Sequence, residues 1–243
     1  MCACPWYDVR MKTIDPTRPL TVTVIVAGTN EPSNSNMLAD TMIEGMKGEF
    51  PQMIVNKVRL KDISIGHFNL ECYGTSCPID GLTHVQSFLQ ESHGVVIATP
   101  VWNFGVPAHL KNLIDRMGAF ALDPSRSLGT FSGTPFFLIF TAGMPKAAWP
   151  FVRKTVSHVP IAIQYFGGSV LGTHFEGACT KGRGVFGLVV DKRPQSLSAA
   201  KQKGAAFARH VQAFKHTGTL PLRYLLIKKF VRLSQRIKKK LGL

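Results

Sequence analysis

The feature that most constrains the fold is an apolar run followed at once by a glycine and a polar loop. Residues 21–27 read Thr-Val-Thr-Val-Ile-Val-Ala, so every position is β-branched or apolar. Such a run is typical of a parallel strand that is buried on both faces of a sheet. The loop that begins at Gly28 gives way to apolar residues spaced as one face of a helix, from Met37 to Met46. We therefore predict a strand, a polar loop and a helix, with Ser35 or Asn36 as the N-cap.

The alternation of strands and helices continues along the chain. Further strands are predicted at 54–60, 94–99, 135–142 and 168–173, and further helices at 81–92, 107–117, 145–159 and 196–214. Pro150 is expected to bend or divide the helix that contains it. This order predicts an α/β protein with a three-layer, doubly wound parallel sheet. The Gly-rich segment 175–194 contains an apolar stretch at 185–190. Two interpretations of this stretch remain, an extra edge strand or part of a lid.

The positive charge is concentrated in the last part of the chain. The formal net charge is +15, but residues 192–243 hold 14 of the 29 Lys and Arg residues and none of the 14 acidic residues. The positive charge therefore lies mainly in the C-terminal segment, and the domain that contains the predicted sheet is nearly neutral. We expect a domain at 21–215, preceded by an extension at 1–20 and followed by a helix at 216–243.

The loop after the first strand is rich in small hydrogen-bonding side chains. They are Thr29, Asn30, Ser33, Asn34, Ser35 and Asn36. In a doubly wound sheet, ligands bind beyond the carboxyl ends of the strands, where the strand order reverses. Hydroxyls, amides and the free N–H groups of a helix N-terminus suit a phosphate dianion. The loop favours a phosphate site, and an ordinary N-capped connection is the alternative.

A second unusual segment follows the strand at 94–99. Residues 99–116 read Thr-Pro-Val-Trp-Asn-Phe-Gly-Val-Pro-Ala-His-Leu-Lys-Asn-Leu-Ile-Asp-Arg. Together with the polar loop, this segment resembles the NAD(P)H-dependent FMN reductase family, which combines a Gly-Ser-type phosphate loop with a Pro-x-Tyr-Asn and Pro-x-x-Leu-Lys-Asn-x-Ile-Asp-Arg pattern. The matching positions are Pro100, Asn103, Pro107, Leu110, Lys111, Asn112, Asp115 and Arg116.

The resemblance spans about residues 21–214 and implies a flavodoxin-like sheet of order 2-1-3-4-5. It also implies FMN as the cofactor and NADPH or NADH as the co-substrate. By this resemblance, Thr29, Ser35 and Asn36 would hold the phosphate, residues 100–104 would wrap the edge of the isoalloxazine, and residues 141–143 would close the far side. The positions implied to bind FMN are Thr29, Asn30, Ser33, Ser35, Asn36, Met37, Pro100, Val101, Trp102, Asn103, Phe104, Thr141, Ala142 and Gly143.

Trp102 stands where the family carries tyrosine. A tryptophan can stack on a flavin, but it lacks the phenolic hydroxyl, so redox tuning is expected to differ. From the residues alone, Trp102 and Phe104 also fit a packed loop. Lys111 and Asp115 have the i,i+4 spacing of a surface ion pair. We assign no catalytic residue, because hydride transfer between a nicotinamide and a flavin requires no protein nucleophile or acid–base pair.

The cysteines are Cys2, Cys4, Cys72, Cys77 and Cys179. Their odd number and sparse spacing argue against the disulfide framework of a secreted protein. Cys72 and Cys77 stand where iron–sulfur flavoproteins of the same superfamily carry a compact set of cysteines. A four-cysteine cluster would have to recruit Cys2 and Cys4 or another chain. We therefore expect no metal site and interpret Cys72 and Cys77 as a loop thiol pair or a remnant.

Residues 219–243 predict a basic amphipathic helix. Its apolar stripe consists of Leu222, Leu226, Phe230, Leu233, Ile237 and Leu241, with Lys and Arg outside the stripe. The helix could pack on the domain or on another subunit, or contact an anionic membrane surface. Nucleic acid is the least expected partner, because no recognised binding module accompanies the charge.

The leading hypothesis is an FMN-dependent NAD(P)H oxidoreductase whose electron acceptor is a quinone, a flavin, an azo or nitro compound, or a metal ion. The alternatives are an electron carrier like flavodoxins or iron–sulfur flavoproteins, and a binding module without cofactor. The resemblance implies a homodimer or homotetramer. No apolar run approaches about 18 residues and no apolar leader opens the chain. We expect a cytoplasmic protein, with peripheral contact to the inner face of a membrane through 219–243 as a further option.

Overall fold

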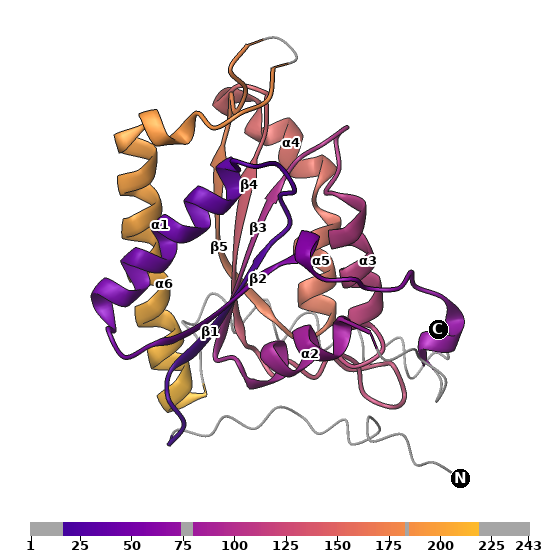
Figure 1. The fold of residues 1–243 in the computed structure, drawn as a ribbon. Helices are drawn as coiled ribbons and strands as arrows, with labels where there is room; N and C mark the ends of the chain where they lie inside the picture. Colours follow the sequence, from indigo (N-terminus) through magenta and orange to yellow (C-terminus); the bar gives the residue numbers. More distant parts are fainter. Residues whose placement is uncertain (1–16, 74–79, 183–184, 219–243) are drawn as a thin grey trace.

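The computed structural model describes residues 17–73, 80–182 and 185–218. The described residues form one sheet with helices on both faces (Figure 1). Its strands are β1 (Thr21–Val26), β2 (Ile54–Arg59), β3 (Gly94–Pro100), β4 (Pro135–Thr141) and β5 (Ser169–Glu176). All neighbours pair in parallel, in the order β2-β1-β3-β4-β5. The predicted α/β class and the flavodoxin-like strand order are confirmed.

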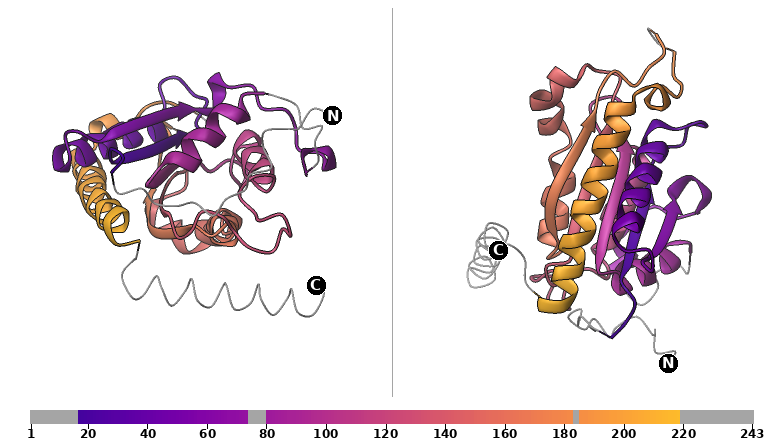
Figure 2. Two further views of the ribbon diagram at one scale, coloured as in Figure 1. Left: turned by 90° about the horizontal axis from the view of Figure 1, so that it is seen from below. Right: turned by 90° about the vertical axis from the view of Figure 1, so that its left-hand side faces the viewer.

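The helices form the two outer layers. They are α1 (Asn34–Glu49), α2 (Leu82–Glu91), α3 (Ala108–Met117), α4 (Trp149–Thr155), α5 (His158–Tyr165) and α6 (Pro194–Thr217). Four short 3₁₀ turns are η1 (Leu60–Asp62), η2 (Leu70–Tyr73), η3 (Lys146–Ala148) and η4 (Val190–Lys192). Helices α1 and α6 cover one face, and α2, α3, α4 and α5 lie on the other (Figures 1 and 2).

Two local expectations need correction, and one alternative that the sequence left open is narrowed. The N-cap of α1 is Ser33, whose hydroxyl accepts a hydrogen bond from the N–H of Asn36, so the helix begins earlier than predicted. Pro150 neither bends nor divides a helix. It lies in the first turn of α4, where the missing N–H costs no intrahelical bond, and the break comes later, at Val156 and Ser157. The stretch 185–190 adds no strand among the described residues and instead runs beside a pocket.

The central strands are buried on both faces, as their composition predicts. In β1, Ile25 packs in one apolar cluster with α2 and α3, while Val24 packs in the other with α1 and α6. Val96 and Ile97 divide in the same way in β3. Alternate side chains of a strand point to opposite faces, so each strand supplies both cores. Because these strands pair in parallel, the carboxyl ends of β1, β3 and β4 lie at one edge of the sheet.

Helices α1 and α6 approach closely because glycines lie at their contact. A Cβ atom on Gly45 of α1 would clash with the backbone carbonyl of Lys201, and one on Gly204 of α6 would clash with that of Met42. These obstacles are backbone atoms, which cannot rotate away. The layer that carries the N-terminus of α1 therefore depends on two positions without side chains.

The predicted helix at 219–243 and residues 1–16 of the predicted N-terminal extension lie outside the described residues, as do Cys2, Cys4 and Cys77. The predicted boundaries at 20 and 215 therefore stay predictions. Within the described parts of the chain, no helix combines the length and apolar character needed to cross a bilayer.

We expect Gly204→Ala to lower the free energy of unfolding by about 1–3 kcal/mol, because the added methyl group forces α6 away from α1. The change would be measured as a shift of the urea midpoint. Gly48→Ala is the matched control, since a Cβ atom on Gly48 would meet no other atom within 4 Å and alanine favours a helix. Equal midpoints for Gly204→Ala and wild type would contradict the close approach.

Candidate functional site

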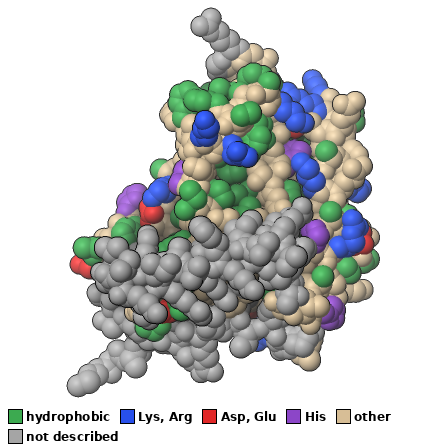
Figure 3. All heavy atoms as spheres, turned by 180° about the vertical axis from the view of Figure 1, so that it is seen from behind, with side chains coloured by type: hydrophobic (Ala, Val, Ile, Leu, Met, Phe, Trp, Pro, Cys, Tyr) green, Lys and Arg blue, Asp and Glu red, His purple; other side chains and the backbone are tan. Residues whose placement is uncertain are grey.

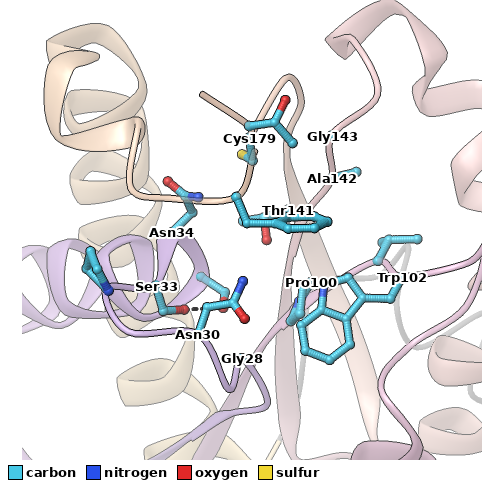
Figure 4. A pocket seen from close by; sticks show the side chains of 15 residues that line it. Gly28, Asn30, Ser33, Asn34, Pro100, Trp102, Thr141, Ala142, Gly143 and Cys179 are labelled. Atoms are coloured by element: carbon cyan, nitrogen blue, oxygen red, sulfur yellow. Dashed lines mark hydrogen bonds between the residues drawn. The ribbon is translucent and has the colours of Figure 1, made fainter. Parts of the chain in front are cut away.

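A pocket opens at the carboxyl edge of the sheet, where the loops after β1, β3 and β4 meet. Figure 4 shows Asn30 and Ser33 on one side of it and Trp102 on the opposite side. The space measures about 460 Å³, part of it open to solvent. The lining residues are Gly28, Asn30, Pro32, Ser33, Asn34, Ser35, Pro100, Val101, Trp102, Thr141, Ala142, Gly143, Cys179, Thr180 and Phe186.

The loop between β1 and α1 forms one wall, and it is built around Gly28. A Cβ atom there would lie 2.7 Å from the Ser33 hydroxyl and closer still to the Ser35 hydroxyl. The two hydroxyl oxygens are 3.1 Å apart. Both therefore crowd over a residue without a side chain, beside the first turn of α1. The N–H groups of a helical first turn have no intrahelical partners, and the helix dipole favours an anion there.

Trp102 forms the opposite wall by means of a tight turn. Its N–H donates to the carbonyl of Gly105 at 2.8 Å, and the N–H of Gly105 donates back at 2.9 Å. The central residues, Asn103 and Phe104, have φ of 49° and 62°. Asparagine tolerates this left-handed region well, but a bulky residue does so rarely. The exposed Phe104 ring packs edge-on against Phe151 of α4, with centroids 5.8 Å apart.

The third wall joins the end of β4 to the segment after β5. The carbonyl of Ala142 accepts a hydrogen bond from the N–H of Cys179, and the N–H of Ala142 donates to the carbonyl of Glu176. The Cys179 thiol is buried and donates to the Glu176 carbonyl at 3.4 Å. Burial, together with the charge of Glu176, raises the pKa of Cys179 to about 11. The thiol is therefore protonated at neutral pH and is not a nucleophile.

An ion pair between the buried Glu176 and the half-buried Arg193 fixes this segment. The Glu176 carboxylate lies 2.7 Å from Arg193 and accepts a hydrogen bond from Ser196 at 2.9 Å. Arg193 also donates to the carbonyls of Gly177 and Ala178, each at 2.7 Å. Burial alone would raise the pKa of Glu176, but His174, Arg193 and Ser196 outweigh it and lower the pKa to about 2. The carboxylate is therefore charged at neutral pH and anchors Arg193.

Nine of the residues assigned from the sequence line this pocket, namely Asn30, Ser33, Ser35, Pro100, Val101, Trp102, Thr141, Ala142 and Gly143. The remaining five do not line it. Thr29 and Asn103 are exposed, Phe104 packs on Phe151, and the half-buried Met37 packs against the apolar cluster between α1 and the sheet. The Asn36 amide donates to Asp40 on the next turn of α1.

Six lining residues were not assigned from the sequence. Gly28, Pro32 and Asn34 belong to the predicted phosphate loop itself, so the loop was a sufficient signal for them. Cys179, Thr180 and Phe186 come from the Gly-rich segment, for which a lid was one of two open interpretations. Their approach to the loop after β1 depends on the tertiary fold, which a pattern in the sequence does not reveal.

The other motif residues have structural roles. Lys111 and Asp115 form the predicted ion pair on the surface of α3, with N–O distances of 2.6 and 2.7 Å. The buried Arg116 pairs with Asp80 at 3.1 Å and donates to the carbonyl of Gly66. Cys72 is buried, and no group of three His, Cys, Asp or Glu residues suited to a metal ion occurs within the described ranges.

Comparison with known proteins supplies the chemical context of this pocket. The family model described as NADPH-dependent FMN reductase matches residues 20–164, which is more than half of the chain. Comparison with curated protein sequences gives no significant match.

Several solved structures share the fold at low identity. An azoreductase from Bacillus anthracis str. Sterne is 17% identical, with a TM-score of 0.58 over 78% of this chain and 98% of that one. An NAD(P)H:quinone oxidoreductase from Methanothermobacter marburgensis is 15% identical, with a TM-score of 0.58 over 77% of this chain and 96% of that one. An FMN-dependent NADH-azoreductase from Bacillus anthracis str. Ames Ancestor, solved with FMN, is 14% identical, with a TM-score of 0.58 over 79% of this chain and 99% of that one. At these identities the likeness establishes the fold.

The pocket fits FMN on its own chemistry. The crowded hydroxyls of Ser33 and Ser35, beside the N-terminus of α1, are a donor set for a phosphate dianion. Trp102 lines the opposite side, and an indole can stack on a planar ring. One wall of the pocket therefore suits the phosphate of FMN, and the opposite wall suits its ring system.

We expect Gly28→Ala to weaken FMN binding at least about tenfold, because the methyl group displaces the hydroxyls of Ser33 and Ser35. Titration of the apoprotein with FMN measures this. Gly105→Ala is the matched control, since its Cβ would meet only the Trp102 carbonyl, at 3.9 Å. Unchanged FMN affinity in Gly28→Ala would show that the phosphate lies elsewhere.

Proposed function

This chain belongs to the NADPH-dependent FMN reductase family, and we propose that it passes hydride from a nicotinamide, through FMN, to a small planar acceptor. It is an NAD(P)H-dependent FMN oxidoreductase with FMN as its cofactor. The acceptor classes that we propose are quinones, flavins, and azo or nitro compounds, with metal ions as a further class. The observation that carries this proposal is the pocket with Ser33 and Ser35 on one wall and Trp102 on the other.

Aromatic side chains at the mouth of the pocket support a planar acceptor. Trp102 and Phe186 line the pocket, and Phe186 is 67% exposed. Exposed aromatic rings beside a pocket favour ligands that offer a flat apolar face. The azoreductase and quinone oxidoreductase that share the fold are named for substrates of this shape.

The charge around the pocket suits an anionic nicotinamide nucleotide. Lys and Arg side chains predominate over Asp and Glu in the upper part of the face in Figure 3. Lys146, Lys181 and Lys192 belong to the segments that border the pocket, and all are exposed. A cationic rim raises the local concentration of an anionic ligand and speeds its encounter with the site.

The protein's own contribution is to bind and orient. Bound FMN supplies the hydride-accepting chemistry. The loop after β1 would hold the phosphate, the turn at 102–105 positions Trp102, and the Glu176–Arg193 pair holds the third wall in place. None of these roles needs a nucleophile or a titrating group near neutral pH, which agrees with the protonated thiol of Cys179 and the charged carboxylate of Glu176.

Anaerobic mixing of the FMN-loaded protein with NADPH or NADH tests the reaction. We expect direct loss of the oxidised flavin absorbance, and its return when a water-soluble quinone is added. A flavodoxin-like electron carrier, the alternative function, would keep its absorbance until a partner reductase was supplied. Absorbance that survives both nucleotides would therefore contradict the reductase and favour the carrier.

We also propose that the protein forms a homodimer or homotetramer. Phe151 of α4 and Ile161 of α5 are 53% and 61% exposed, and Phe104 lies beside Phe151. Apolar side chains that gather on a surface are typical of contacts between subunits. Sedimentation velocity measures the state directly, and a purely monomeric species at micromolar concentration would contradict it.

The C-terminal segment 219–243 is proposed to bring the enzyme to an anionic membrane surface. It carries eight Lys and Arg residues and no acid, and each is worth about 1 kcal/mol near an anionic bilayer. We expect the full chain to cosediment with vesicles that contain phosphatidylserine, and a chain ending at Gly218 to stay in solution. Equal cosedimentation of both forms would contradict the membrane role.

A further inference from the structure

The segment from Val185 to Val190, which we call the strap, runs from the third wall of the pocket to the start of α6. Its second half is well packed, since Val190 is fully buried and Leu188 and Val189 pack on the apolar cluster under α1. Its first half is different. Phe186 lines the pocket and yet leaves 67% of its side chain exposed.

The strap is tied to the phosphate loop by one side chain. The Asn34 amide nitrogen donates to the carbonyl of Gly187 at 2.8 Å, and its amide oxygen accepts from the N–H groups of Val189 at 2.9 Å and Val190 at 3.2 Å. These bonds join residues more than 150 positions apart in the chain. Asn34 is also the first residue of α1, directly after the N-cap Ser33.

This bonding pattern separates Asn34 from its neighbours in the loop. The Ser33 and Ser35 hydroxyls contact each other above Gly28, where an anion would lie. The Asn34 side chain instead uses its oxygen fully, and one of its two N–H groups, on the strap. The Asn34 amide pairs with both N–H and carbonyl groups of the strap backbone. These bonds give the strap a defined position relative to α1.

We propose that Asn34 is a positioning residue, which holds the strap so that Phe186 forms an apolar wall against the flavin in the pocket. Phe186 is not needed to anchor the strap, because Val190 and the Asn34 amide already do so. A bound flavin would cover an aromatic ring that is otherwise exposed to water, and ring–ring contact adds to affinity. The inference rests on flavin binding in this pocket.

Flavin titrations with and without the phosphate separate positioning from direct phosphate binding. The apoprotein would be titrated with FMN and with riboflavin, followed by flavin fluorescence, for Asn34→Ala, Phe186→Ala, the double variant, and Ser35→Ala as control. We expect Asn34→Ala and Phe186→Ala each to lower the affinity for FMN and for riboflavin by the same factor, about five- to tenfold. The double variant should be little weaker than Asn34→Ala, since both changes remove one wall. Ser35→Ala should lower the affinity for FMN and leave that for riboflavin unchanged.

Limited proteolysis of the apoprotein reports on the strap without any flavin. Chymotrypsin cleaves after residues such as Phe186 and Leu188, and we expect Asn34→Ala to be cut there faster than wild type while cleavage elsewhere keeps its rate. The circular dichroism melt of each variant checks that the domain is folded. Phe186→Ala removes only an exposed side chain and so keeps the fold in any case.

Three results would overturn the inference. Asn34→Ala could weaken FMN but not riboflavin, with unchanged proteolysis, which would make Asn34 a direct phosphate ligand. Phe186→Ala could leave both flavin affinities unchanged, which would show that Phe186 does not form a wall against the flavin. Additive losses in the double variant would show that the two residues act independently. A wild-type protein that bound neither flavin would instead refute the proposed function, and proteolysis would still test the tie between Asn34 and the strap.

Discussion

The turn from β1 into α1 leaves no room for a side chain at residue 28, and the rest of the site depends on that constraint. Two serine hydroxyls occupy the space that a Cβ atom would fill, next to the N-terminus of α1, where the first-turn amides have no intrahelical partner. The helix itself is held by its contact with α6, where Gly45 and Gly204 permit backbone to approach backbone. Close packing between α1 and α6 therefore helps to determine where the hydroxyls of Ser33 and Ser35 lie.

The parallel sheet then brings the other walls to the same edge. Since β1, β3 and β4 are adjacent in the sheet, their carboxyl ends carry the loops at 28–36, 100–105 and 141–143 to one place. Each loop contributes a different chemistry, namely donors for an anion, an aromatic face, and backbone that joins the segment after β5. The Glu176–Arg193 pair and the Asn34 amide hold that last segment from opposite ends.

Most of the fold could be predicted from local patterns, because β1, β3 and β4 are short, mainly apolar runs and helical spacing lies between the strands. The differences between prediction and structure are local too. Pro150 starts a helix where a break was expected, and the N-cap of α1 is Ser33 and not a later residue. The walls supplied by Trp102 and Ser33 were predictable from motifs, whereas that of Phe186 was not. Its place depends on the bonds from Asn34 to the strap, and spacing along the chain carries no sign of such distant pairs.

A crystal structure of the protein with FMN tests the central claim most directly, because the claim concerns where each part of the cofactor lies. We expect the phosphate over Gly28, within hydrogen-bonding distance of the Ser33 and Ser35 hydroxyls and the first turn of α1. The ring system is expected beside Trp102, with Phe186 against it. FMN bound at another edge of the sheet, or with its phosphate away from this loop, would contradict the claim.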